Sequence, residues 1–348
     1  MRTITLFNNK GGVGKTTTLA HLAAYFSLEM KKKVLVMDLD PQANITQLTF
    51  GEDELDDIFQ SGSNNIVNII DPLNDEVSTK ISNISNNIRR SKDKEKKIHN
   101  FGYDIIPSHP TLSRFEETLS NAWTDMRAIK KGGIIRTNWL LQLLREAEEL
   151  NYDYVFIDVG PSLGALNRSI LLNTEFLVTP MGADIFSVLG AENISEWVSL
   201  FRKQYNRAID GFNLDYENFI KNELLTQTSD SSTIFLGYLI QQSLLYKGRA
   251  TRAYQAVTDP IPDAIFDNLE FLNLKNIPKE DLFLGEIKNL KSLIPESQSN
   301  HIPMFKLNAS NTKSIQGANL ALPVEAKKIF ETICTKIISN IEVNSNEL

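Results

Sequence analysis

Cysteine is almost absent from this sequence, since Cys334 is the only one among 348 residues. A single thiol cannot build a disulfide framework within the chain, and it cannot hold a metal or an iron–sulfur cluster through paired cysteines. No apolar run approaches the roughly eighteen residues of a membrane-spanning helix. The N-terminus has no basic segment followed by an apolar core, so no signal peptide is visible. We therefore expect a cytoplasmic protein that does not bind membranes.

An overall excess of positive charge is also lacking, because the formal net charge is −7. This balance argues against extensive coating of nucleic acid, although a local basic patch would suffice for contact with DNA. The segment 80–97 carries seven basic and two acidic residues, and we interpret it as a solvated surface rather than a DNA-binding one. The apolar share of 42% is ordinary for a globular protein that buries a substantial core.

A glycine-rich loop lies near the N-terminus, where Asn9–Thr17 read N-K-G-G-V-G-K-T-T. The loop follows an alternating apolar run and precedes a helix-like stretch, which is the setting in which a phosphate-binding loop works. We expect Lys15 to reach the β- and γ-phosphates of a nucleotide and the Thr16 hydroxyl to ligate Mg²⁺. The match to G-x-x-x-x-G-K-[ST] is incomplete, because position 9 is Asn and a second lysine, Lys10, precedes the double glycine. An accidental glycine-rich turn is disfavoured, since both flanking contexts agree with the motif.

Carboxylates follow two of the predicted strands. Asp38 and Asp40 stand one residue apart at the end of the apolar run that begins at Val34, and Asp158 ends the run Y-V-F-I-D. The carboxyl ends of parallel strands meet in the crevice where open α/β sheets bind ligands. These acids can hold Mg²⁺ or its waters and can orient the water that attacks a γ-phosphate.

Strand-like and helix-like segments alternate along the chain, which predicts right-handed βαβ units and an open, mostly parallel twisted sheet with helices on both faces. We expect one domain over 1–348, interrupted by polar, partly helical insertions at about 51–100, 206–230 and 259–300. The predicted strands are 3–8, 34–37, 101–107, 154–158, 175–180, 234–240 and 302–307, and the predicted helices are 15–30, 139–150, 185–201 and 324–341.

The loop with its extra lysine resembles the deviant phosphate-binding loop of the ParA/MinD family of ATPases. The stretches D-L-D-P-Q-A-N and Y-D-Y-V-F-I-D-V-G-P-S-L-G resemble ParA-type members in particular, although Ala43 and Gly160 replace a glycine and a proline that are usual there. The resemblance implies a P-loop NTPase fold and Mg²⁺-dependent hydrolysis of ATP. It assigns Asp40 to positioning the water, Asp38 to assisting near Mg²⁺, and Asp158 to a Walker-B-like role. The nucleotide-binding residues that it implies are Lys10, Gly11, Gly12, Val13, Gly14, Lys15, Thr16 and Thr17.

The resemblance also implies a homodimer that forms with ATP, in which Lys10 of each subunit reaches the nucleotide of the other. Such proteins partition plasmids or chromosomes: the dimer binds DNA nonspecifically, and a ParB-like partner stimulates hydrolysis. The protein would then be associated with the nucleoid. The candidate DNA contacts are Lys247, Arg249 and Arg252, for which a solvated cationic helix is an equal alternative.

Other functions for the same core remain open. A ParA-like ATPase that positions or regulates another cargo, including one in phage defence, would have the same site, and the three insertions could carry its specific partners. A MinD-like membrane-positioning ATPase is disfavoured, because the tail after Ile341 is acidic and polar rather than a basic amphipathic helix. A cluster-carrying relative is disfavoured by the lone cysteine.

Overall fold

The strongest apolar runs of the sequence form the centre of a seven-stranded sheet, with the strand order β5-β2-β6-β1-β7-β8-β9. Every pairing between neighbouring strands in this sheet is parallel, so the predicted α/β fold class is confirmed. The computed structural model describes residues 1–60, 62, 64–75, 78–93, 96–182, 185–227, 233–241, 262–263, 277–288, 290, 293–312, 315 and 320–345. The strands of the sheet are β1 Arg2–Leu6, β2 Val34–Asp38, β5 Asp104–Ile106, β6 Tyr154–Asp158, β7 Phe176–Gly182, β8 Ile234–Gln241 and β9 Phe283–Ile287.

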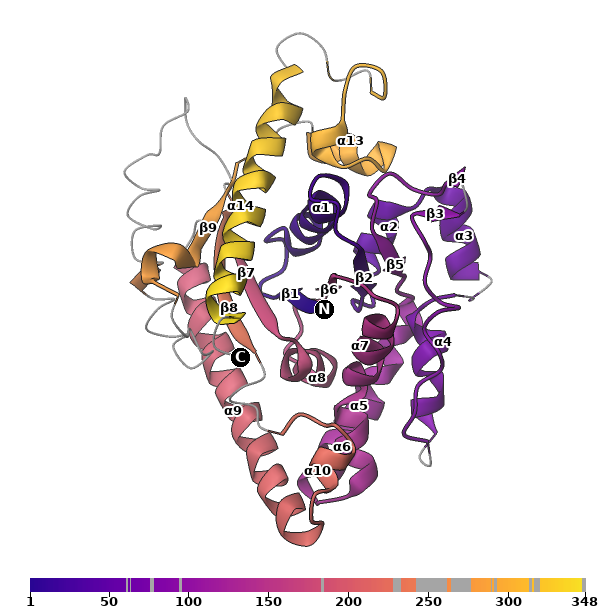
Figure 1. The fold of residues 1–348 in the computed structure, drawn as a ribbon, viewed down its shortest axis with the longest axis vertical. Helices are drawn as coiled ribbons and strands as arrows, with labels where there is room; N and C mark the ends of the chain where they lie inside the picture. The colour runs from indigo at the N-terminus through magenta and orange to yellow at the C-terminus, as the bar shows by residue number, and fades with distance from the viewer. Residues whose placement is uncertain are drawn as a thin grey trace.

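Helices cover both faces of this sheet. Figure 1 shows α1 and α14 on one side of the strands and α7 and α8 on the other. Because both faces are covered, the interior strand β2 is buried along its whole length, which explains why its sequence is a continuous apolar run. The α-helices are α1 Lys15–Leu28, α2 Asn44–Thr49, α3 Glu52–Gln60, α4 Ile66–Ile70, α5 Phe115–Arg127, α6 Lys131–Thr137, α7 Trp139–Glu149, α8 Ala165–Asn173, α9 Ile185–Asp215, α10 Phe219–Asn222, α13 Leu293–Asn300 and α14 Leu322–Ser345.

The parallel register brings the carboxylates together. Asp38 at the end of β2 is paired with Asp158 at the end of β6, and Asp158 is in turn paired with Leu6 of β1. The glycine loop follows β1 directly. All three chain segments that the sequence singled out therefore leave the sheet at the same edge.

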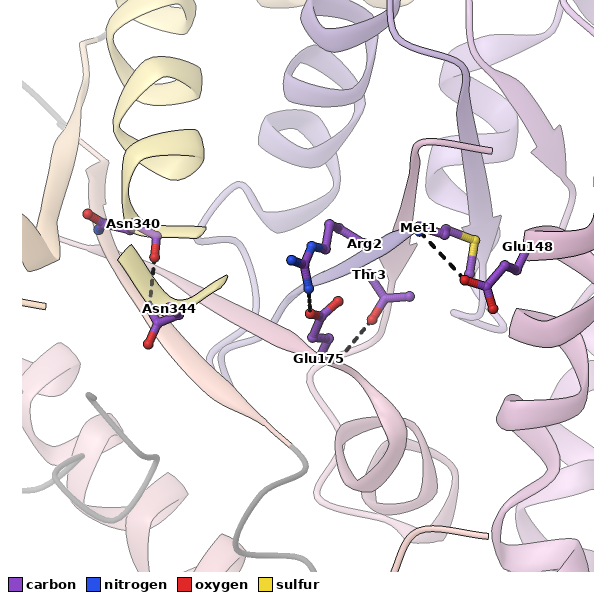
Figure 2. A network of polar contacts seen from close by, with 7 residues as sticks. All are labelled: Met1, Arg2, Thr3, Glu148, Glu175, Asn340 and Asn344. Atoms are coloured by element: carbon purple, nitrogen blue, oxygen red, sulfur yellow. Dashed lines mark hydrogen bonds and ion pairs between the residues drawn. The ribbon is translucent and has the colours of Figure 1, made fainter. Parts of the chain in front are cut away.

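The opposite edge of the sheet is tied by polar contacts. Figure 2 shows Arg2, at the start of β1, in an ion pair with Glu175, the residue before β7. The backbone N–H of Glu175 also donates to Thr3 Oγ1 over 2.8 Å. These contacts align β1 and β7 at the ends of the strands that lie away from the glycine loop.

Several predicted elements have different bounds in the structure. The strand predicted at 302–307 is wrong, because these residues hold only a 3₁₀ turn, η6 Met304–Lys306, preceded by Pro303. The strand β9 and the helix α13 lie instead inside the segment predicted as an insertion at 259–300. The helix predicted to end at 201 continues as α9 to Asp215, so the first residues of the segment 206–230 belong to it.

The segment 51–100 contains α3, α4, a 3₁₀ turn η1 at Asp71–Asn74, and a short antiparallel pair, β3 Lys92–Asp93 and β4 Lys96–Lys97. Its isoleucines join the main core, which gives this polar segment a packed inner side. The core isoleucines of the segment are Ile58, Ile66, Ile69, Ile70, Ile84 and Ile88. Among the described residues, no helix combines the length and the apolar character needed to cross a bilayer.

Candidate functional site

The glycine loop joins β1 to α1 and has a backbone that only glycine adopts without strain at two positions. Gly12 and Gly14 have φ of 75° and 68°, in the left-handed region. Space is also limited at Gly14, where a Cβ atom would lie 2.7 Å from Gln241 Nε2. Gly14 forms the N-cap of α1, so the backbone N–H groups of the first turn point into the loop.

The start of the loop is fixed to the sheet by Asn8. Its Nδ2 donates to the carbonyl of Pro180 in β7 over 2.8 Å, and its Oδ1 accepts from the backbone N–H of Lys10 over 2.9 Å. On the far side, Gln241 Nε2 donates to Thr18 Oγ1 over 2.8 Å and supports the first turn of α1. The loop is therefore held in shape from both sides before any ligand binds.

A cavity of about 650 Å³ opens above this loop. The glycine loop forms its floor, and the segment after β2 forms one wall. The residues that line the cavity are Gly11, Gly12, Gly14, Lys15, Thr16, Thr17, Asp40, Gln42, Asn44, Gln47, Leu48, Pro161 and Gln298. The cavity is large enough for a nucleotide. Beyond the glycine loop, neutral carboxamide groups line it, namely those of Gln42, Asn44, Gln47 and Gln298.

Lys15 lies almost fully inside this site, with 7% of its surface exposed. Its Nζ donates to the carbonyl of Lys10 over 2.9 Å and so spans the loop. Burial lowers the pKa of Lys15, while Asp158 and Asp40 oppose that shift. A nucleotide phosphate in the loop would offer this ammonium group a stronger partner than a backbone carbonyl.

Asp158 is the buried acid with the most unusual surroundings. It is fully buried, and among the described residues neither carboxylate oxygen has a hydrogen-bond partner. Burial and then the charge of Asp38 raise its pKa well above the usual range, while the nearby Thr16 hydroxyl acts in the opposite direction. Two unpartnered buried oxygens beside a threonine hydroxyl are the chemistry that a divalent cation satisfies, so these residues fit Mg²⁺.

The protein alone supplies few ligands for such an ion. Within the described part of the chain, no group of three or more His, Cys, Asp or Glu residues is arranged to hold a metal. Mg²⁺ usually keeps several waters and binds through one or two protein groups together with substrate phosphates. The site therefore fits an ion that enters with a nucleotide.

The two acids after β2 have different surroundings in the structure. Asp38 is fully buried, and its Oδ2 accepts from Thr46 N over 3.0 Å and from Thr46 Oγ1 over 2.6 Å. Burial raises the pKa of Asp38 to about 7. Asp40 instead lines the cavity, where its Oδ1 accepts from Gln42 N over 3.0 Å. Asp38 thus shapes the loop that presents Asp40, and Asp38 is not among the residues that line the cavity.

The other predicted site residues are Lys10 and the candidate DNA contacts. The side chain of Lys10 is partly buried, while its backbone N–H and carbonyl are bound to Asn8 and Lys15. The candidate DNA contacts Lys247, Arg249 and Arg252 lie outside the described residues.

Sequence reasoning missed part of the cavity wall. Asn44, Gln47 and Leu48 follow the D-L-D-P-Q motif on α2, so the position of the motif could have suggested them. Gln298 comes from α13, far away in the sequence, and no local signal marked it.

Comparison with known proteins agrees with this geometry. A family model described as an AAA domain, AAA_31, matches residues 1–210. A virulence plasmid ParA family protein of Chlamydia psittaci, pGP5-D, is 33% identical over 199 residues, which are 57% of this chain and 64% of that protein. This chain thus matches less than two thirds of the length of that relative. The sporulation initiation inhibitor protein Soj of Bacillus subtilis is 29% identical over 203 residues, which are 58% of this chain and 67% of Soj.

Two solved structures resemble most of the chain. A Corynebacterium diphtheriae protein aligns with a TM-score of 0.66 at 29% identity, covering 86% of this chain and 97% of that one. An ATP complex of McdA from Cyanothece aligns with a TM-score of 0.57, covering 97% of this chain and 96% of that one. Its identity of 16% makes this a similarity of fold alone.

Proposed function

Starting from the fact that this chain belongs to the AAA_31 family of AAA domains, with ParA and Soj proteins among its relatives, we propose that it is a ParA-type switch ATPase. It hydrolyses ATP to ADP and phosphate with Mg²⁺, dimerises when ATP is bound, and partitions DNA. The observation that carries the proposal is the buried Asp158 carboxylate without a hydrogen-bond partner among the described residues, which lies beside Thr16 at a preformed glycine loop.

The residues of this chain divide the work of phosphoryl transfer. The loop N–H groups and Lys15 bind the phosphates, and Thr16 and Asp158 hold the cation. Mg²⁺, when bound, neutralises charge on the phosphate oxygens. Asp40, which faces the cavity, orients the attacking water, while Asp38 fixes the loop behind it. Positioning and charge neutralisation supply most of the catalysis in reactions of this class.

Lys10 links hydrolysis to assembly. In the proposed dimer, Lys10 of one protomer contacts the phosphates bound by its partner and stabilises charge in the transition state. Cationic groups that act in this way contribute about 10³ to 10⁵ in rate. Because ADP lacks the γ-phosphate, hydrolysis removes that contact and weakens the dimer.

The ATP-bound dimer binds DNA nonspecifically through a basic segment that includes Lys247, Arg249 and Arg252, and a ParB-like partner accelerates hydrolysis. This activity would place the protein on the nucleoid in the cytoplasm. The similarity to a plasmid-encoded ParA family protein of Chlamydia psittaci supports the assignment to DNA partition.

The proposal is tested by measuring ATP turnover with Mg²⁺, with and without double-stranded DNA, for the wild type, Lys15→Ala and Asp40→Asn. We expect turnover in the wild type, loss of nucleotide binding in Lys15→Ala, and retained binding with turnover reduced at least tenfold, about 1.4 kcal/mol in the barrier, in Asp40→Asn. A wild type that binds ATP but never releases phosphate, with or without DNA, would contradict the assignment.

A further inference from the structure

The loop that follows Asp158 is held by a buried asparagine on the next helix. Asn167 of α8 is 3% exposed, and its Nδ2 donates to the carbonyl of Gly160 over 2.8 Å and to the carbonyl of Ser162 over 2.7 Å. One side chain therefore fixes the loop at two points. Removing it would leave two carbonyl groups without their partner and would release the loop.

Gly160, the first residue that Asn167 holds, lies against Asp40. A Cβ atom on Gly160 would lie 3.1 Å from Asp40 Oδ1 and 3.4 Å from Oδ2, so the backbone of Gly160 forms one wall around the carboxylate. The N–H of Gln42 also contacts the carboxylate and donates to Oδ1 over 3.0 Å. The carboxylate of Asp40 is thus held between Gly160 and Gln42.

A second anchor fixes the far end of the same loop. Glu116 of α5 accepts from the backbone N–H groups of Ala165 and Leu166, the latter over 3.1 Å, at the start of α8. A carboxylate at this end of a helix is favourable, because it meets the unpaired N–H groups and the positive end of the helix dipole. The first turn of α8, which carries Asn167, therefore has a fixed position relative to the loop.

We propose that Asn167 is a positioning residue for hydrolysis, which acts through Gly160 to hold the Asp40 carboxylate in the orientation that aligns the attacking water. The inference rests on the proposed function, in which Asp40 has that role. Asn167 is not among the residues that line the cavity, so its loss should disturb the chemical step and leave nucleotide binding almost unchanged. A misplacement of about 1 Å at a reacting group can cost about 10²-fold in rate.

Asn173 provides a matched control on the same helix. It is also buried, and its Nδ2 donates to the carbonyl of Ser169 over 2.9 Å and to that of Thr137 over 3.4 Å, at the end of α8 away from the cavity. We expect Asn167→Ala and Asn173→Ala to lower the melting temperature by similar amounts. Only Asn167→Ala should lower kcat, by roughly 10- to 100-fold, with KM changed by less than about twofold. An equal loss of kcat in both variants would overturn the proposal.

Asn167→Leu is a second variant, which keeps the branched shape of the side chain and removes the Nδ2 donor of both hydrogen bonds. It should lower kcat in the same range even if Asn167→Ala fails to fold. Wild-type kcat in Asn167→Leu would show that these hydrogen bonds do not position Asp40, and the proposal would be withdrawn.

The decisive comparison places Asn167→Ala in an Asp40→Asn background, with single-turnover rates measured at excess enzyme. If Asn167 acts only through Asp40, the double variant should be no slower than Asp40→Asn alone. If the rate losses of the two single variants multiply in the double variant while the wild type turns over ATP, the role of Asn167 is overturned and the proposed function is not. No turnover in the wild type, or wild-type turnover in Asp40→Asn, would instead overturn the proposed function and this inference with it.

Discussion

At the scale of single residues, the burial of Asp158 carries the most chemical meaning. An ionised carboxylate in a buried position without hydrogen bonds is costly, so this position disfavours the ionised form of Asp158 and raises its pKa. A cation bound between Asp158 and Thr16 would reverse that preference. Metal binding at Asp158 should therefore raise the free energy of unfolding of the protein.

Replacing Asp158 by asparagine tests this link. The variant should unfold at the wild-type temperature or higher in EDTA, because it has no acidic group at this buried position. The extra stabilisation that Mg²⁺ gives over ADP alone should fall by at least about 1.4 kcal/mol, a tenfold loss of Mg²⁺-dependent affinity. Thermal unfolding with ADP, with and without Mg²⁺, measures both effects, and an unchanged Mg²⁺ contribution would exclude Asp158 as a ligand.

His21 illustrates how a buried residue of α1 responds to pH. It is fully buried, with Nδ1 2.7 Å from the carbonyl of Thr17, to which it donates, and Nε2 3.2 Å from Ser297 Oγ. Burial lowers the pKa of His21 to about 4. The unfolded chain takes up the proton near the usual pKa of about 6.5, so this group lowers stability as pH falls from about 6.5 toward 4.

The variant His21→Gln should lose that part of the pH dependence. The wild type should lose on the order of 3 kcal/mol more than the variant between pH 7 and pH 4, since each unit of pKa difference corresponds to about 1.4 kcal/mol. Urea unfolding of both proteins at several pH values gives the difference, in which the similar effect of His99 cancels. Parallel curves would mean that the pKa of His21 is the same in the folded and the unfolded protein.

At the scale of elements, a buried amide group helps to fasten the end of the C-terminal helix α14 to the sheet. Asn340 is 4% exposed, and its Nδ2 donates to the carbonyl of Leu236 in β8 over 2.8 Å and to that of Asp281 over 3.0 Å. Asn344 Nδ2 then donates to the carbonyl of Asn340 over 2.7 Å (Figure 2). These contacts bind the end of α14 to β8 and to the turn before β9.

Asn340→Ala should therefore destabilise the protein by about 2 kcal/mol, because two buried carbonyls lose their donor. Thr335→Ala is the control, since its hydroxyl bonds only to Glu331 of its own exposed helix face and should cost under about 0.5 kcal/mol. Urea unfolding at pH 7 compares them. Equal stabilities for the two variants would show that the Asn340 contacts do not hold α14.

The parts of the fold and site that the sequence predicted are those with local causes. The loop around Gly14 and the acids Asp40 and Asp158 follow strands, and parallel strands bring their ends to one edge. Gln298 and Asn167 could not be predicted, because their places depend on how α13 and α8 pack. The prediction of a strand at 302–307 is wrong because apolar residues alone do not supply a strand to pair with. The last place in the strand order, next to β8, is occupied by β9.

At the scale of the whole molecule, distant parts of the chain close the site from one side. Ser297 of α13 contacts His21 of α1, and Asn100 Nδ2 donates to the carbonyl of His301 over 2.9 Å. Lys306 and Lys327 both pair with Glu29 at the end of α1. Segments after residue 290 thus pack on the helix that follows the glycine loop, which places the C-terminal part of the chain beside the cavity.

A whole-molecule switch also needs a second copy, and Lys10 is the residue proposed to read the nucleotide of that copy. Its loop is already shaped by Asn8 and Lys15, so ATP would change the contact across the interface more than the fold of one subunit. Lys10→Ala should consequently keep nucleotide binding within one subunit and lose nucleotide-dependent assembly.

The most direct measurement is the mass in solution, by sedimentation equilibrium with Mg²⁺, of the wild type and Lys10→Ala. We predict that the wild type is a dimer with a non-hydrolysable ATP analogue and a monomer with ADP. Lys10→Ala should stay monomeric with both nucleotides, each at a concentration that saturates the protein. Equal masses of the wild type with the analogue and with ADP, at saturating nucleotide, would contradict the proposed switch.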